Sequence, residues 1–207
     1  MSQPNVLILN AHPGKGRLAH ALAEAYADGA RLGGAQAQVV ALADLRFDPS
    51  LHDGFEGSQP LEPDLLAMKA AIESSRHLTI VTPLWWGADP ALLKGFIDRV
   101  FLPRWAFRYK PNGFPEGLLA GRSARIIRTM DSPGVWYRFV LWRSADTALG
   151  RATLRFCGFG PVHHTRVTSV RTLKAPAFQR AIEGARRDGL SDARALVRGS
   201  RTTPSAP

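Results

Sequence analysis

The sequence has one cysteine, Cys157, so an internal disulfide is excluded, as is common in cytosolic proteins. It also has no uninterrupted apolar run of about 18 residues, the length that a membrane-spanning helix needs. Residues 1–10 lack the basic start and the cleavage pattern of a secretory signal peptide, and they are typical of a strand instead. We therefore expect a cytoplasmic protein that has no membrane span.

Two kinds of binding chemistry also find little support in the sequence. The six histidines include no pair at the H-x-x-x-H spacing of a helical zinc site, so no metal is expected. The net charge of +10 comes from residues 122–207, which hold 16 Lys and Arg against 5 Asp and Glu. Because these arginines are scattered and no nucleic-acid-binding motif accompanies them, nucleic acid is not an expected partner.

The chain does contain an alternation of short apolar runs and helical patterns over its 207 residues, 45% of which are apolar. The runs typical of buried parallel strands are residues 5–10, 38–42, 77–82, 122–130 and 162–170. Helical apolar spacing is found in residues 18–32, 63–74, 90–100, 145–157 and 175–188. This alternation predicts an α/β fold: a three-layer, doubly wound, five-stranded parallel sheet with the strand order 2-1-3-4-5. We expect one domain over residues 1–190 and a disordered tail over 199–207.

Two segments have no predicted element. Residues 43–62 form a long loop, and loops of this length are usually functional or disordered. Residues 101–121 contain three prolines, which exclude a long helix, and five aromatic side chains. The aromatic and basic part of this segment, residues 101–114, is predicted to contribute to a subunit interface that walls a binding site. The alternative is that its aromatics fold back onto the core.

The loop between the first predicted strand and the first helix carries basic side chains and glycines. It contains His12, Lys15 and Arg17, and it leads directly into Leu18 and Ala19 at the helix N-terminus. Free amides, the positive end of a helix and basic side chains together suit a phosphate group. The loop matches neither the P-loop nor the G-x-G-x-x-G pattern, and the alternative is a turn whose glycines serve chain geometry only.

The third predicted strand ends at Pro83, which cannot donate to a strand ladder, and Leu84, Trp85 and Trp86 follow it. Backbone amides after the proline and the flat indole rings suit a planar heterocycle. The alternative is that the two tryptophans belong to the core or to a dimer interface. Asp89 is predicted to cap the next helix.

The fourth strand ends in another turn, which holds Thr129, Asp131, Ser132 and Gly134, and Tyr137 follows it. In the predicted strand order, all three loops converge near the switch point between the first and third strands, where open α/β sheets bind ligands. A phosphate at one side and a planar ring at the other fit flavin mononucleotide (FMN). Tyr137 is the candidate hydrogen-bond donor to an oxygen of the molecule that the flavin would reduce. The alternative is that it packs with its tryptophan neighbours.

Four stretches of the chain resemble one known family. They are Ala11-His12-Pro13, residues 18–22, residues 82–101 and Phe156-Cys157-Gly158-Phe159. They are similar to motifs of the flavodoxin-like NAD(P)H:quinone oxidoreductases, of the NAD(P)H dehydrogenase (quinone) or modulator of drug activity B type. The resemblance implies a protein that binds FMN or FAD, takes NADPH or NADH as co-substrate, and reduces quinones by ping-pong hydride transfer. It also implies a homodimer with the site at the subunit interface.

The resemblance further implies roles for single residues. His12 matches the family histidine near the flavin phosphate. Residues 83–86 match the loop that lines the isoalloxazine ring, while Thr129 and residues 131–134 match the loop beside the pyrimidine end of that ring. Tyr137 lies near the family's active-site tyrosine.

The chain also departs from the family pattern. Arg17 stands where the family usually has serine, and Arg143 lies near the place of a family histidine, so the resemblance does not extend to a histidine proton relay. FMN is preferred to FAD because no adenine pocket can be recognised in the sequence. Two alternatives remain for the function: a flavodoxin-type electron carrier, against which the strong positive charge argues, and a flavin-binding regulatory subunit of a potassium efflux system.

Overall fold

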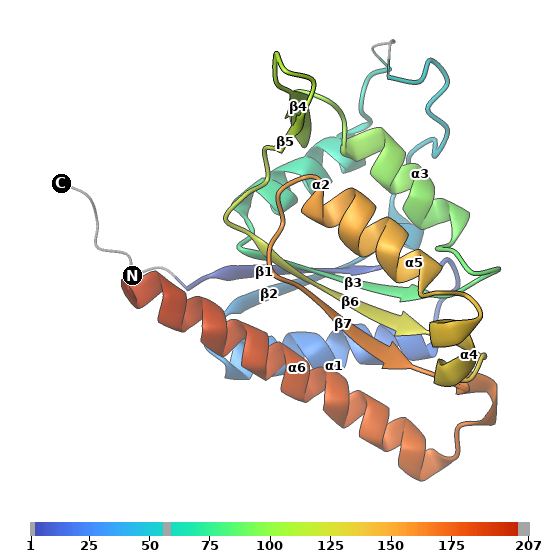
Figure 1. Ribbon diagram of the computed structural model, residues 1–207. Helices are drawn as coiled ribbons and strands as arrows, with labels where there is room; N and C mark the ends of the chain where they lie inside the picture. The colour runs from blue at the N-terminus through green and yellow to red at the C-terminus, as the bar shows by residue number, and fades with distance from the viewer. Residues whose placement is uncertain (1–2, 56–58, 203–207) are drawn as a thin grey trace.

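The computed structural model describes residues 3–55 and 59–202, and its centre is a parallel sheet of five strands with helices on both faces (Figure 1). The strands are β1 (Asn5–Asn10), β2 (Gln36–Ala41), β3 (His77–Pro83), β6 (Ser123–Thr129) and β7 (Val162–Val167). They lie in the order β2-β1-β3-β6-β7, all parallel to their neighbours. Counted by themselves, these strands have the order 2-1-3-4-5, which is consistent with the prediction.

Burial explains why the strands could be recognised from their composition. Every position of β3 is buried, and so are all positions of β1 after the first. Strands covered on both faces need apolar side chains in both directions, hence their continuous apolar runs. The edge strand β2 alternates between exposed and half-buried residues over its first half instead.

Helices cover the two faces of the sheet in separate layers (Figure 1). One layer holds α1 (Leu18–Leu32) and α6 (Ala175–Thr202). The other holds α2 (Pro63–Ser74), α3 (Ala91–Val100), α5 (Ser144–Asp146) and its π-helical continuation over Thr147–Arg155. Short helices occupy Leu42–Asp44, Gly134–Phe139 (α4) and Val170–Thr172. Each layer encloses its own hydrophobic core, because successive residues of β1 point to opposite faces.

The helices α1 and α6 pack with their backbones unusually close together. A Cβ atom on Gly29 of α1 would lie 1.9 Å from the backbone oxygen of Arg186. On α6, a Cβ atom on Gly189 would lie 2.1 Å from the backbone oxygen of Tyr26. Only glycine fits at such crossings, so these two residues set the spacing of the layer.

The structure corrects the predicted C-terminal region. Helix α6 was expected to end at Asp188, but it continues to Thr202, because Ala193 and Leu196 beyond that point pack against the core beneath α1. Residues 199–202 of the predicted disordered tail therefore belong to a helix. The rest of that tail, residues 203–207, lies outside the described residues.

The two segments without predicted elements both contact the body of the fold: residues 101–121 pack on the hydrophobic core, and residues 43–62 are held by a side chain of α3. Residues 107–117 form a small antiparallel hairpin of β4 (Phe107–Tyr109) and β5 (Pro115–Gly117). Two of the aromatics of 101–114, Phe101 and Phe107, are buried in the core, whereas Tyr109 and Phe114 are exposed. Strands of three residues are too short to show a period in the sequence.

The long loop 43–62 is anchored by Arg99 of α3, whose side chain is fully buried. Its guanidinium donates two hydrogen bonds to the Glu62 carboxylate, at 3.1 and 2.9 Å. It also donates to the backbone oxygens of Asp48 and Pro60. Residues 56–58 of this loop lie outside the described residues. None of the helices in the described part combines the length and the apolar character that a membrane crossing needs.

Candidate functional site

A cleft of 230 Å³ opens at the carboxyl ends of β1, β3 and β6, where the strand order reverses. The residues that line it are His12, Arg17, Leu18, Ala19, Pro83, Leu84, Trp85, Thr129, Met130, Asp131 and Val170. The three loops expected to converge do meet here, and nine of the fourteen predicted site residues line the cleft. A larger groove of 690 Å³ lies at the amino ends of the strands, near Arg76 and His163, and none of the predicted site residues lines it.

His12 is held in one orientation by its own loop. The backbone N–H of Gly14 donates to His12 Nδ1 at 2.9 Å, and the His12 backbone N–H donates to Asn10 Oδ1 at 3.1 Å. His12 Nδ1 also lies 3.1 Å from the Gly14 backbone oxygen, and its role in that contact depends on the tautomer. In the tautomer in which Nδ1 accepts from Gly14 N–H, the ring proton of the neutral imidazole lies on Nε2. The pKa of His12 is lowered, mainly by burial and also by the nearby positive charge of Arg17. At neutral pH His12 is therefore an uncharged donor at the edge of the cleft.

The N-terminus of α1 has the features of an anion site. Arg17 is its N-cap residue, and no side chain caps the first turn. No acidic residue lies in that turn either. The first amides of a helix have no partner within the helix, so here they and the Arg17 guanidinium are available to an anion. This arrangement fits a phosphate group.

The loop after β3 is a tight turn. Leu84 N–H donates to the Thr129 backbone oxygen at 2.7 Å, which joins the loop to β6. Trp85 and Ala88 then exchange backbone hydrogen bonds of 3.0 and 2.9 Å around Trp86. The ring of Trp85 meets that of His12 edge to face, with 5.7 Å between the centroids. The loops that follow β1 and β3 thus contact each other across the cleft.

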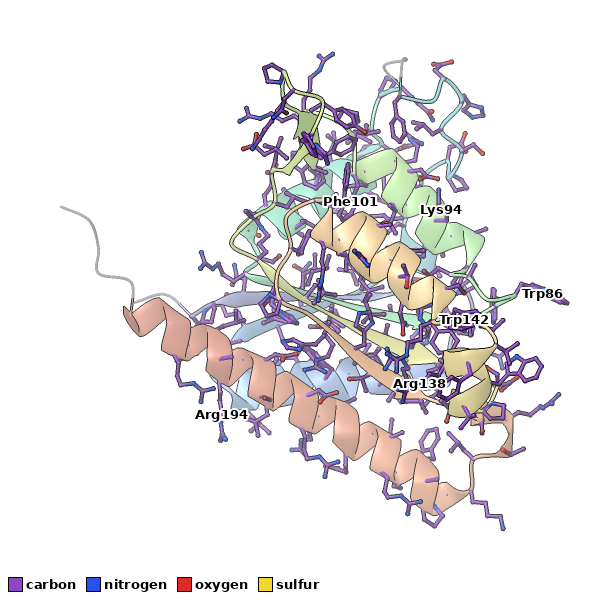
Figure 2. All side chains as sticks on the ribbon, in the orientation of Figure 1. Trp86, Lys94, Phe101, Arg138, Trp142 and Arg194 are labelled. Carbon is purple, nitrogen blue, oxygen red and sulfur yellow. The ribbon has the colours of Figure 1, made fainter. Side chains whose placement is uncertain are left out.

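Four other predicted binding residues do not line the cleft. Lys15 instead forms an ion pair of 2.8 Å with Asp44. Trp86 is fully exposed and points outward from its turn (Figure 2). The hydroxyl of Ser132 is buried without a hydrogen-bond partner, and Gly134 faces the side chain of Thr168. The turns that follow β1, β3 and β6 direct these residues away from the crevice.

Tyr137 was expected to contact an acceptor, but its side chain is buried beneath α4, with 1% of its surface exposed. Its hydroxyl oxygen accepts a hydrogen bond of 3.0 Å from the backbone N–H of Asp146. Burial raises the pKa of Tyr137 to about 12, and the Asp146 carboxylate adds to the rise. Tyr137 therefore joins α4 to α5, while its neighbours Trp136 and Trp142 face outward.

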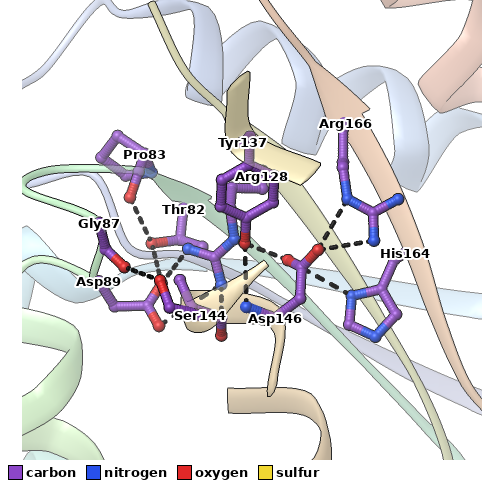
Figure 3. Close-up of polar contacts among 11 residues, drawn as sticks. Thr82, Pro83, Gly87, Asp89, Arg128, Tyr137, Ser144, Asp146, His164 and Arg166 are labelled. Carbon is purple, nitrogen blue, oxygen red and sulfur yellow. Dashed lines mark hydrogen bonds and ion pairs between the residues drawn. The ribbon is translucent and has the colours of Figure 1, made fainter. Parts of the chain in front are cut away.

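Sequence reasoning missed Arg128, which is the central residue of a buried ion-pair network beside the cleft (Figure 3). Asp89, expected to cap α3, pairs with Arg128 instead, and Pro90 is the N-cap residue. The available signal was a charged residue inside an apolar strand, since an arginine buried in a sheet must have a partner.

Several exposed apolar side chains lie on segments that directly follow cleft-lining residues, and we call them together the α4 patch. It consists of Trp86, Val135, Trp136, Phe139, Val140 and Trp142, whose exposed fractions run from 47% to 103%. Large apolar side chains exposed near one another often belong to surfaces that contact other molecules.

These features place the chain among flavodoxin-like proteins, which carry ligands at this edge of a parallel sheet. The family model described as a flavodoxin-like fold matches residues 4–188, and the chain belongs to this family. An uncharacterized NAD(P)H oxidoreductase of Haemophilus influenzae is 28% identical over 172 residues, which cover 77% of this chain and 85% of the relative. The human ribosyldihydronicotinamide dehydrogenase (quinone) is 29% identical over 117 residues, or 52% of this chain. That match covers 48% of the human protein, so the chain spans about half of its length.

Solved structures show the same fold. An NAD(P)H:quinone oxidoreductase from Methanothermobacter marburgensis superposes with a TM-score of 0.78 at 21% identity, covering 92% of this chain and 97% of that one. An FMN-dependent NADH-azoreductase from Bacillus anthracis, solved with FMN, gives a TM-score of 0.71 at 20% identity, with coverages of 92% and 100%.

Proposed function

We propose that this protein is a flavin-dependent NAD(P)H oxidoreductase that reduces quinones or related acceptors by ping-pong transfer of two electrons as a hydride. The observation that carries the proposal is the cleft at the switch point, with an uncapped, basic helix N-terminus at one side and an indole-lined turn at the other. The names of the relatives, which include quinone reductases and NAD(P)H oxidoreductases, agree with it.

The residues of the cleft suit FMN in the following way. Arg17, the first amides of α1 and His12 Nε2–H would hold the phosphate. Trp85 and the backbone around Leu84 would border the flat ring, and Thr129 and Asp131 would lie on its remaining side. A bound flavin supplies the hydride-transfer chemistry, and the protein binds and orients it. We prefer FMN to FAD because the residues that line the cleft offer a place for one phosphate group and one flat ring.

The first test is a cofactor and turnover measurement. Protein incubated with FMN should bind one flavin per chain, seen as visible flavin absorption after gel filtration. The loaded protein should oxidise NADPH or NADH in the presence of a soluble quinone, and initial-rate plots should give parallel lines because both substrates use one slot in turn. Bound flavin without turnover would favour an electron carrier or a regulatory subunit. Intersecting lines would refute the shared slot, and absence of flavin binding would refute the proposed function.

We also propose that a second copy of the chain completes the site. The cleft of one chain is smaller than the roughly 300–1,000 Å³ of most ligand sites. Trp86 has a left-handed backbone with φ of 52°, which costs a non-glycine residue about 1–2 kcal/mol, and its side chain contacts little within the chain. Such a residue is explained if a partner covers it. The interface predicted over residues 101–114 is less suitable, because Figure 1 shows the hairpin apart from the strand ends that form the cleft.

Substitutions can separate these two interfaces. We expect a dimer in light scattering, and Trp142→Ser in the α4 patch should raise its dissociation constant about 30-fold, since buried interface tryptophans contribute about 2 kcal/mol or more. Tyr109→Ser removes an aromatic side chain from the hairpin that is 66% exposed, against 76% for Trp142, and should leave the dissociation constant within about twofold. The opposite ranking of the two variants would place the interface on the hairpin, and a monomeric, fully active wild type would exclude a required dimer.

A further inference from the structure

The side chain of Arg128 is fully buried and makes contacts with two different chain segments (Figure 3). Its Nη1 donates to Asp89 Oδ1 at 2.5 Å, so that the guanidinium is bound to the end of the loop that lines the cleft. Its Nε donates to Asp146 Oδ1 at 3.0 Å, and its Nη2 donates to the Ala145 backbone oxygen at 3.2 Å, both on α5. Arg128 directly precedes Thr129, which lines the cleft.

Each carboxylate of the network has a further partner. Asp89 Oδ1 also accepts a hydrogen bond of 3.1 Å from Thr82 Oγ1. Asp146 Oδ2 accepts one of 2.7 Å from Arg166 Nε on β7. Burial alone would raise the pKa of Asp146, but His164, Arg166 and Arg128 together hold it below its usual range. The positive charges of Arg128 and Arg166 thus offset the negative charges of Asp89 and Asp146 beside the cleft.

The same region holds the turn 84–89 by a second contact. Ser144 Oγ donates to the Gly87 backbone oxygen at 2.8 Å, which ties the tip of the turn to α5. The backbone is left-handed at Trp86 and again at Trp142 and Arg143, with φ between 50° and 52°. Strained turns of this kind persist only where the surroundings over-determine them.

We propose that Arg128 is a positioning residue: by holding Asp89 and α5 with one guanidinium, it keeps the turn 84–89 in the shape that binds the flavin. This inference rests on the proposed function of the cleft. Only arginine can serve, because its rigid fork reaches both carboxylates at once, whereas lysine offers a single point charge. The residue touches no cleft ligand itself and acts through the backbone of Leu84 and Trp85.

The test compares two buried arginines of the same chain. Arg99 is equally buried and paired with Glu62, but it anchors the loop 43–62 and not the cleft. We expect both Arg128→Lys and Arg99→Lys to lower the melting temperature. Only Arg128→Lys should raise the FMN dissociation constant, by about tenfold or more, while Arg99→Lys changes it by less than twofold. Equal effects of the two variants on FMN affinity would overturn the proposal.

A second readout needs no cofactor. In the flavin-free protein, Arg128→Lys should speed hydrogen exchange of the amides in residues 84–89 at least tenfold, with no change there in Arg99→Lys. If Arg128→Lys does not fold, Asp89→Asn weakens the link between the Arg128 guanidinium and the turn and should show the same effects in weaker form. Unchanged exchange overturns the positioning role even where FMN binds, and a wild type that binds no FMN refutes the proposed function while exchange still decides the role of Arg128.

Discussion

Replacing Arg17 by glutamate is expected to weaken FMN binding by roughly 100-fold, a larger loss than the change of about tenfold expected for Arg128→Lys. Charge-assisted hydrogen bonds contribute about 1.5–3 kcal/mol each, and the new carboxylate would also repel the phosphate. The fold should not suffer, since an acidic residue at the start of α1 favours the helix dipole by about 0.3–1 kcal/mol. Fluorescence titration with FMN measures the loss, and urea unfolding measures stability.

Lys15→Glu is the matched control for this prediction. It changes the net charge by the same amount two residues away, but the ammonium of Lys15 faces Asp44 outside the cleft. FMN affinity should therefore fall less than threefold. Riboflavin, which lacks the phosphate, should bind the wild type and Arg17→Glu alike. If Lys15→Glu weakens FMN as much as Arg17→Glu does, the phosphate is not bound by α1 as proposed.

Gly29→Ala is expected to lower the free energy of unfolding by about 3 kcal/mol, at the upper end of what overpacking usually costs. The new methyl group would lie 1.9 Å from the backbone oxygen of Arg186. A backbone atom cannot move aside by changing a rotamer, so α1 and α6 must separate and expose apolar surface. The shift of the urea midpoint at an unchanged slope measures the loss.

The control is a glycine of the partner helix α6, Gly184. Gly184 has no atom within 4 Å of the position that a Cβ would take. Gly184→Ala should therefore raise stability by up to about 1 kcal/mol, because alanine loses less conformational freedom in a helix than glycine does. Opposite signs for the two glycines are expected. A loss below about 1 kcal/mol for Gly29→Ala would mean that the two helices are not packed as closely as described.

Much of the fold could be predicted because its signals are local. The continuous apolar runs of β1 and β3 follow from burial on both faces, and helical spacing marked α1 and α3. The predicted end of α6 was wrong, because nothing in the sequence near Asp188 shows that later residues find apolar partners on α1. The hairpin of β4 and β5 was missed because its strands are three residues long.

The lining of the cleft was predicted in part, and the differences have a common cause. Lys15 turns toward Asp44, which lies on a different element. Tyr137 faces inward while Trp136 faces outward, and adjacent aromatics carry no local signal that separates them. Arg128 finds its partners 39 and 18 residues away in the chain, at Asp89 and Asp146.

The sequence by itself determined the layered sheet and the place of the cleft, since apolar periods and turn residues act over a few neighbouring positions and the ends of parallel strands meet at one edge. The tertiary structure alone decided which side chains enter that cleft, as Arg17 does, and which turn away, as Lys15 and Trp86 do. It also decided which buried charges are paired. The physical reason is that the direction of a side chain depends on partners brought near by folding, and a charge is stable in the core only beside such a partner.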